Sequence, residues 1–220
     1  MISAAVDTQG ERFSQPVGGP TSLVDLPNAV RPVPRVNPNR KKVLFVTSEI
    51  ADLVKTGGLG DVSAALPRAM AHLHDVRVLI PGYRQVRAAY PDIPIVGRLD
   101  GFAQVPACDL GLVETEDGLS IYVLLNADLF EREGTPYGDA GGDFCDNDLR
   151  FARLSLAAAE IALGRDPAWR ADLLHLNDWQ AALAPAYLAW RGIRVPSVLT
   201  IHNLAYQGLF PQGNLGRLGV

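Results

Sequence analysis

A glycine-rich stretch at residues 55–61 is the first part of the chain whose residue types could bind a ligand. Its sequence is KTGGLGD, and it lies between a predicted strand and a predicted helix. Glycines let backbone N–H groups approach a ligand closely, and a helix N-terminus adds unpaired donors and a positive dipole end. The stretch could therefore hold a phosphate group. It matches neither the G-x-G-x-x-G fingerprint nor the Walker A loop. A tight turn with Asp61 at the helix start is an equally good interpretation.

Polar residues also follow two later predicted strands. Asp178 and Trp179 come after one, and His202 and Asn203 come after the next. Each has an ordinary structural interpretation, since an Asp entering a helix is commonly an N-cap and a Trp or a lone His is commonly structural. However, the carboxyl ends of parallel strands lie along one edge of a sheet, where ligands of α/β proteins bind. We therefore expect these residues and the 55–61 stretch to converge.

The elements that must position these residues alternate between strand and helix. The apolar run 43–47 predicts a buried parallel strand. Apolar residues at helical spacing between 62 and 73 predict a helix that Pro67 should kink or end. A second apolar run at 76–80 predicts the next strand, which implies a parallel pair with a right-handed crossover.

The middle of the chain departs from this alternation. Three short apolar runs predict antiparallel strands added to the sheet: 93–96, 102–105 and 119–125. Residues 131–145 predict a long loop. The alternation then resumes in four predicted elements: a helix over 146–164, a strand over 173–176, a helix over 178–191 and a strand over 196–201. The predicted fold class is α/β, a Rossmann-like, doubly wound parallel sheet with antiparallel additions.

Composition limits the classes of function. The 220 residues carry a formal net charge of −4, which argues against nucleic acid as the main partner because a phosphate backbone needs a basic face. No apolar run approaches the roughly 20 residues of a membrane span, and the N-terminus lacks the pattern of a secretory signal, so we expect a cytoplasmic protein. Cys108 and Cys145 show no metal-type spacing and are expected to be reduced thiols.

The first 40 residues differ from the rest of the chain. Residues 1–40 hold six of the sixteen prolines and no sustained periodicity, which predicts a disordered proline-rich arm. Residues 41–220 are expected to form one domain. The role of the arm stays open.

Four separated motifs, in this order, resemble those of the bacterial glycogen synthases and plant starch synthases. They are KTGGLGD at 55–61, TPY at 135–137, HLNDW at 175–179 and HNLAYQG at 202–208. The resemblance covers nearly everything from 42 to 210. Members of this family are retaining glucosyltransferases of the GT-B type, with two Rossmann-like domains across a cleft, that move glucose from ADP-glucose to an α-1,4-glucan without a cofactor or metal. The resemblance implies that this chain is the N-terminal, acceptor-side half, incomplete at its C-terminus.

The resemblance also implies roles for individual residues. It assigns catalysis and substrate positioning to Tyr137, Asp178 and His202, with His202 facing the transferred glucose. It places the donor's nucleotide and diphosphate against Lys55, Gly57, Gly58, Asp61 and Asn203. Because the second domain would complete the cleft, we expect the 220 residues alone to be inactive. Two alternatives stay open, namely a non-catalytic glucan-binding module and a related glycosyltransferase with another donor. Glycogen versus starch as product and the oligomeric state also stay open.

Overall fold

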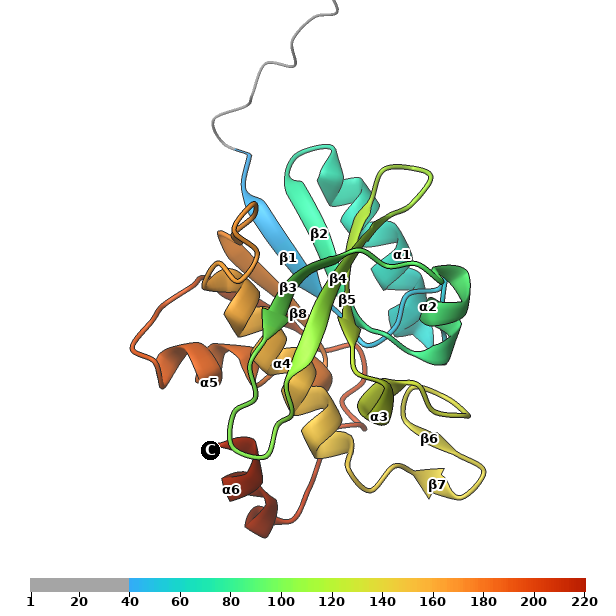
Figure 1. The fold of residues 1–220 in the computed structure, drawn as a ribbon, viewed down its shortest axis with the longest axis vertical. Coiled ribbons are helices and arrows are strands. Elements are labelled where there is room, and N and C mark those ends of the chain that lie inside the picture. The colour runs from blue at the N-terminus through green and yellow to red at the C-terminus, as the bar shows by residue number, and fades with distance from the viewer. Residues whose placement is uncertain (1–39) are drawn as a thin grey trace, which may run out of the picture. The chain divides into compact units, whose positions relative to one another are not determined.

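The computed structural model describes residues 40–220, so the predicted arm lies, apart from Arg40, outside the described residues. A seven-stranded sheet forms the centre of this part (Figure 1). Its strands are β1 (Lys42–Val46), β2 (Asp75–Pro81), β3 (Ile95–Leu99), β4 (Cys108–Glu114), β5 (Ser120–Leu125), β8 (Leu173–Asn177) and β9 (Ser197–Thr200). The order across the sheet is β3-β4-β5-β2-β1-β8-β9. The five strands from β5 to β9 in this order are mutually parallel, whereas β3 and β4 pair antiparallel at one edge. The predicted fold class, a parallel sheet with antiparallel additions, is therefore confirmed, but the run 119–125, which was predicted as one of the additions, forms β5 and pairs parallel with β2.

Helices connect the parallel strands. They are α1 (Gly58–Ala71), α2 (Arg84–Ala89), α3 (Ala127–Phe130), α4 (Asn147–Ala162), α5 (Ala184–Ala189) and α6 (Leu215–Leu218), with 3-10 turns η1 (Trp179–Ala181) and η2 (Gln212–Asn214). A small hairpin of β6 (Gly138–Asp139) and β7 (Gly142–Asp143) lies in the predicted loop. The β1-α1-β2 and β5-α4-β8 crossovers run in opposite directions along the sheet. Right-handed crossovers therefore place α1 and α4 on opposite faces, as a doubly wound fold requires.

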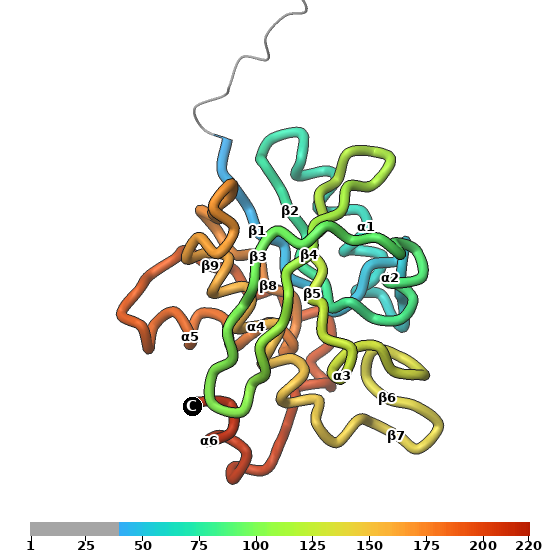
Figure 2. The backbone as a smooth tube through the Cα atoms, in the orientation of Figure 1, coloured from blue at the N-terminus to red at the C-terminus, as the bar shows by residue number. Residues whose placement is uncertain are grey.

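Helix α4 is the most enclosed helix of the described chain. Every residue of α4 except Leu149 is buried, because the sheet, α5, η1 and α6 all pack against it. Arg153 forms an ion pair with Glu160, which lies further along the same helix. Its guanidinium also donates to the backbone carbonyls of Asp100 at 2.8 Å and of Pro106 at 3.1 Å. The buried guanidinium thus fixes the loop between β3 and β4. In both Figure 1 and Figure 2 this loop lies beside α6, and Gln104 N donates to Arg217 O at 2.9 Å.

Two predictions about the middle strands were wrong. Residues 102–105 form only a turn closed by an isolated bridge between Phe102 and Val105. The adjacent strand β4 was not predicted, because Gly111 interrupts its apolar pattern. The structure explains this glycine: a Cβ at position 111 would lie 2.3 Å from the side chain of Ile93. A strand glycine at such a close approach is common.

Two predictions about helices also need correction. Helix α1 continues through Pro67 to Ala71, so the proline does not end it. The helix expected over 178–191 is interrupted, because η1 and α5 are separate elements. Asp178 has φ +55° and its side chain makes no capping hydrogen bond, so its interpretation as an N-cap was wrong. Among residues 40–220 no helix has the length and hydropathy needed to cross a membrane.

Candidate active site

A cavity of about 710 Å³ opens at the carboxyl ends of β1, β8 and β9. Its volume suits a small-molecule ligand. The residues that follow these three strands contribute to one wall, as the sequence predicts, and the loop before α4 contributes another. The predicted site residues that line the cavity are Gly57, Gly58, Tyr137, Asp178, His202 and Asn203.

Glu49 holds the glycine-rich turn in place. Glu49 lies three residues after the end of β1 and is 3% exposed. Its carboxylate accepts hydrogen bonds from Thr56 N at 2.6 Å, Thr56 Oγ1 at 2.5 Å and Gly57 N at 3.1 Å. Burial acts to raise the pKa of Glu49, but the hydrogen bonds from Thr56, Tyr137 and the backbone N–H groups outweigh it and hold the pKa below its ordinary value. The carboxylate is therefore ionised at neutral pH and fixes the start of α1.

Tyr137 is joined to the same carboxylate. Its hydroxyl donates to Glu49 at 2.5 Å and lies 2.9 Å from Ser48 Oγ, while Asn147 Nδ2 donates to its carbonyl at 2.7 Å. Burial, with the neighbouring Tyr83 and Glu49, raises the pKa of Tyr137. The phenol therefore stays protonated at neutral pH. Glu49 thus ties two of the predicted motifs together across 88 residues of sequence.

Buried Arg150 supports the segment that carries Tyr137. Its guanidinium donates to the carbonyls of Leu129 at 2.6 Å and Pro136 at 2.8 Å, and to Asn147 Oδ1 at 2.5 Å. Three aromatic rings lie against it, with Phe144 nearest at 4.7 Å. The loop before α4 is therefore anchored to the helix at its base.

Asp178 occupies a backbone conformation that few residues other than glycine adopt. Its φ is +55° and the residue is 8% exposed. The carboxylate accepts from His202 N at 2.6 Å, and Asp178 N donates to Thr200 O at 2.9 Å. With ψ −175° the residue lies in a positive-φ region that is populated almost only by glycine, and such strained residues are often found at ligand sites. This pair of bonds joins the ends of β8 and β9 at the cavity wall.

The ring of His202 is oriented by a buried asparagine. Asn177 Nδ2 donates to Val46 O at 3.0 Å, which turns its Oδ1 toward His202 Nε2, also at 3.0 Å. Because Oδ1 only accepts, Nε2 carries the proton in the neutral imidazole. The other ring nitrogen, Nδ1, is then an acceptor available to a ligand. Burial lowers the pKa of nearby His175 below its ordinary value, so this ring is neutral at neutral pH.

Two predicted donor-binding residues lie outside the cavity wall. Lys55 Nζ and Asp61 Oδ1 form an ion pair at 2.7 Å, and their side chains are 46% and 60% exposed. Each therefore neutralises the other at the surface. The structure brings together six of the eight predicted residues and leaves these two beside the cavity.

Comparison with known proteins identifies the family. The family described as the starch synthase catalytic domain matches residues 42–220. The chain belongs to this family. A glycogen synthase of Pseudomonas fluorescens strain Pf-5 is 59% identical over 100% of this chain and 43% of its own length, and one of Pseudomonas putida is 56% identical over 97% and 42%. The chain thus spans about two fifths of these relatives.

A solved structure shows the same relationship. The catalytic domain of starch synthase IV from Arabidopsis thaliana, bound to ADP and acarbose, superposes with a TM-score of 0.65 at 28% sequence identity. The superposition covers 82% of this chain and 38% of that one. The fold of this family member is therefore shared beyond the bacterial relatives.

Sequence reasoning missed Glu49, Asn147 and Arg150. Glu49 had a usable signal, since Ser48 and Glu49 are polar residues placed directly after the buried 43–47 run, on the edge where the site was expected. Asn147 and Arg150 had none, because their main partners are backbone carbonyls of the preceding loop, which residue types do not reveal. Within the described chain, no group of three or more His, Cys, Asp and Glu residues is placed to hold a metal ion.

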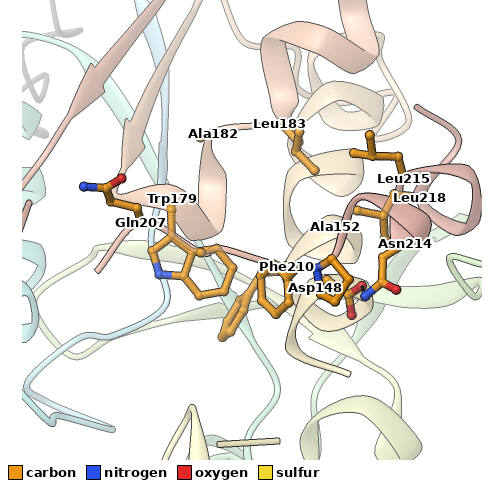
Figure 3. A pocket seen from close by; sticks show the side chains of 13 residues that line it. Asp148, Ala152, Trp179, Ala182, Leu183, Gln207, Phe210, Asn214, Leu215 and Leu218 are labelled. Carbon is orange, nitrogen blue, oxygen red and sulfur yellow. Dashed lines mark hydrogen bonds between the residues drawn. The ribbon is translucent and has the colours of Figure 1, made fainter. Parts of the chain in front are cut away.

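A second, smaller cavity lies on the other side of Trp179. Its volume is about 240 Å³, and residues of α4 and of the C-terminal segment 207–218 line it (Figure 3). Trp179 lines both cavities and packs against the ring of Phe210 at 5.5 Å. Gly208 lies so close to the indole that a Cβ there would meet it at 2.2 Å. Trp179 is therefore a partition between the two spaces, held by contacts on both sides.

Proposed function

We propose that these residues form the acceptor-side wall of a glycogen synthase. In this proposal the protein transfers glucose from ADP-glucose to the non-reducing end of an α-1,4-glucan, with retention of configuration. The observation that carries it is the 59% identity with a glycogen synthase over the whole chain. The convergence of six predicted residues on one cavity supports the same function.

The reaction breaks the bond between the anomeric carbon and the diphosphate oxygen. It forms a bond from that carbon to the acceptor's 4-hydroxyl oxygen, and the proton of that hydroxyl passes to the departing diphosphate as ADP leaves. We assign His202 to the transferred glucose, with Nδ1 as acceptor for a sugar hydroxyl. Asp178 and Tyr137 position donor and acceptor sugars. A negative wall also stabilises the positive charge that develops at the anomeric carbon.

ADP is proposed as the nucleotide because the starch synthase IV structure is bound to ADP. Gly58 at the start of α1 lines the cavity, and a diphosphate oxygen there would meet the N-terminal end of the helix, although Gly57 N is already bonded to Glu49. No cofactor and no metal enter the proposed reaction.

The charge of the wall bears on the activity of this chain by itself. Of the residues that the structure describes, no lysine or arginine lines the cavity, whereas Glu49, Asp143 and Asp178 do. This wall cannot neutralise a leaving diphosphate, and losing even one preorganised donor costs about 3 kcal/mol of barrier. We therefore expect negligible turnover from residues 1–220 alone.

The test is transfer of labelled glucose from ADP-glucose to glycogen. The 220-residue chain is assayed alone and with a second polypeptide, the part of the Pseudomonas fluorescens relative that lies beyond the matched residues. Transfer only in the mixture supports the proposal, and UDP-glucose in parallel reports donor preference. Robust turnover by the chain alone would contradict the argument from charge. No transfer in either case, with maltoheptaose still bound, would favour a glucan-binding module.

A further inference from the structure

Gln180 stands out among the residues of the cavity wall. In the described part of the chain, three enclosed side-chain polar atoms have no hydrogen-bond partner: Tyr83 Oη, Arg153 Nε and Gln180 Oε1. Of these three residues only Gln180 lines the 710 Å³ cavity. Proteins keep few unpaired enclosed polar groups, and one at a cavity wall points to a partner that arrives with a ligand.

The backbone of Gln180 is fixed from two sides. Its carbonyl accepts from Ser155 Oγ of α4 at 3.1 Å, and the residue lies two positions after Asp178, whose carboxylate is bonded to the end of β9. The residue is 5% exposed. The side chain is therefore placed by its surroundings although no protein group binds its amide oxygen.

The chemistry of the amide selects the kind of ligand. A carboxamide is uncharged and offers both an acceptor oxygen and donor N–H groups. It suits a sugar hydroxyl, which also donates and accepts. A phosphate oxygen, by contrast, only accepts and would leave Oε1 unpaired. The nearby carboxylate of Asp178 likewise disfavours an anion at this place.

We propose that Gln180 binds a hydroxyl of a glucosyl unit in the cavity. The hydroxyl donates to Oε1, the acceptor that no protein group occupies. The inference rests on the proposed function, since it names a further specificity residue for the same site. The glucosyl unit belongs either to the donor or to the glucan acceptor, which an experiment can separate.

The experiment compares Gln180→Met with the wild-type 220-residue chain. Methionine has nearly the same shape and no group that needs the missing partner. Ligand titrations followed by NMR measure Kd for maltoheptaose, ADP-glucose and ADP, and thermal unfolding gives Tm. The control is Gln104→Met, at an exposed glutamine outside both cavities.

We expect Gln180→Met to weaken glucosyl binding about five- to tenfold, the worth of one hydrogen bond. Tm should stay equal or rise, since an unpaired buried acceptor is removed. Weaker maltoheptaose binding assigns the hydroxyl to the acceptor. Weaker ADP-glucose binding with unchanged ADP binding assigns it to the donor.

Two results would overturn the inference in different ways. Unchanged Kd values for both sugars, with the wild type binding them, would overturn the role of Gln180 and leave the proposed function standing. A wild-type chain that binds neither sugar at millimolar concentration would overturn both. A fall in Tm with unchanged Kd would show that the residue is only structural.

Discussion

Replacing Glu49 by glutamine tests how the cavity wall is held together. Glu49 Oε2 accepts from two backbone N–H groups, of Thr56 and Gly57, which can only donate. Oε1 accepts from two hydroxyls, of Thr56 and Tyr137, which can turn and accept instead. A glutamine can therefore keep its oxygen on the N–H side and point its amide nitrogen at the hydroxyls.

The expected cost follows from this substitution of partners. Four hydrogen bonds to a charged carboxylate become hydrogen bonds to a neutral amide, and each then stabilises the fold by about 0.5 to 1 kcal/mol less. The neutral amide recovers about 1 kcal/mol because it is cheaper to bury. We expect Glu49→Gln to lower the free energy of unfolding by about 2 kcal/mol, and Glu49→Leu, which leaves the N–H groups without an acceptor, by about 4 kcal/mol.

The dependence on pH gives a sharper test. The pKa of Glu49 is lowered in the folded state from 4.5, so its stabilisation is fully present above that value and is lost as pH falls through the lower, folded pKa. Glutamine does not titrate. The stability gap between wild type and Glu49→Gln should therefore be largest at pH 7 and should narrow as the pH falls below the ordinary glutamate pKa of 4.5.

Urea unfolding followed by tryptophan fluorescence measures this gap at each pH. The matched control is Glu116→Gln, at an exposed glutamate with no hydrogen-bond partner among the described residues. A gap that stays constant from pH 7 to about pH 3.5 would refute the assignment of an ionised carboxylate. So would a loss at Glu49 no larger than the loss at Glu116.

Three other perturbations have definite expected outcomes. Asp178→Ala should lower the free energy of unfolding, measured in urea, by about 2 kcal/mol, because the backbone N–H of His202 loses its acceptor while the positive φ remains. Asp178→Asn should lower it by less, because the amide oxygen can still accept that hydrogen bond. Arg217→Gln removes the charged partner of the buried Asp148 carboxylate on α4, to which Asn214 Nδ2 also donates, and should lower the free energy of unfolding by about 3 kcal/mol, with faster hydrogen exchange over 215–220. A thiol reagent should modify exposed Cys145 quickly in the native protein and Cys108 only on unfolding, since burial raises the pKa of Cys108 to about 11.

Each of these outcomes has a contradicting result. Equal losses of unfolding free energy for Asp178→Ala and Asp178→Asn would show that the hydrogen bond from His202 N does not account for the stabilisation by Asp178. Unchanged exchange over 215–220 would show that contacts other than the ion pair hold α6. Two thiols titrating at the same rate in native protein would contradict the burial of Cys108.

The sequence was sufficient for the parallel core because burial there leaves a simple pattern. The β1 run VLFV is buried at every position, and a continuous apolar run has that meaning in a parallel sheet. The edge strands gave weaker signals. In β4 the glycine that makes room for Ile93 breaks the apolar run, so the pattern encodes a contact that only the folded chain reveals.

In the candidate site, too, some features could be predicted from the sequence and others could not. Strand order brought Asp178 and His202 together, as expected from where their strands end. Their hydrogen bond, the positive φ at Asp178 and the orientation of His202 by Asn177 depend on atoms from three strands. No spacing in the sequence specifies such contacts. Lys55 and Asp61 show the converse, since they belong to the glycine-rich motif and yet pair with each other outside the cavity.

The position of β1 at the centre of the sheet sets the order in which the chain can fold. One neighbour, β2, follows about 30 residues later, whereas the other, β8, supplies its contacts from as far as 130 residues away, as between Lys42 N and Asp172 Oδ2. At the pace of the ribosome, that interval is about ten seconds. During it one edge of the central strand has no partner, which favours association with other chains. Synthesis rate and chaperone supply should therefore govern the soluble yield of this protein more than its final stability does.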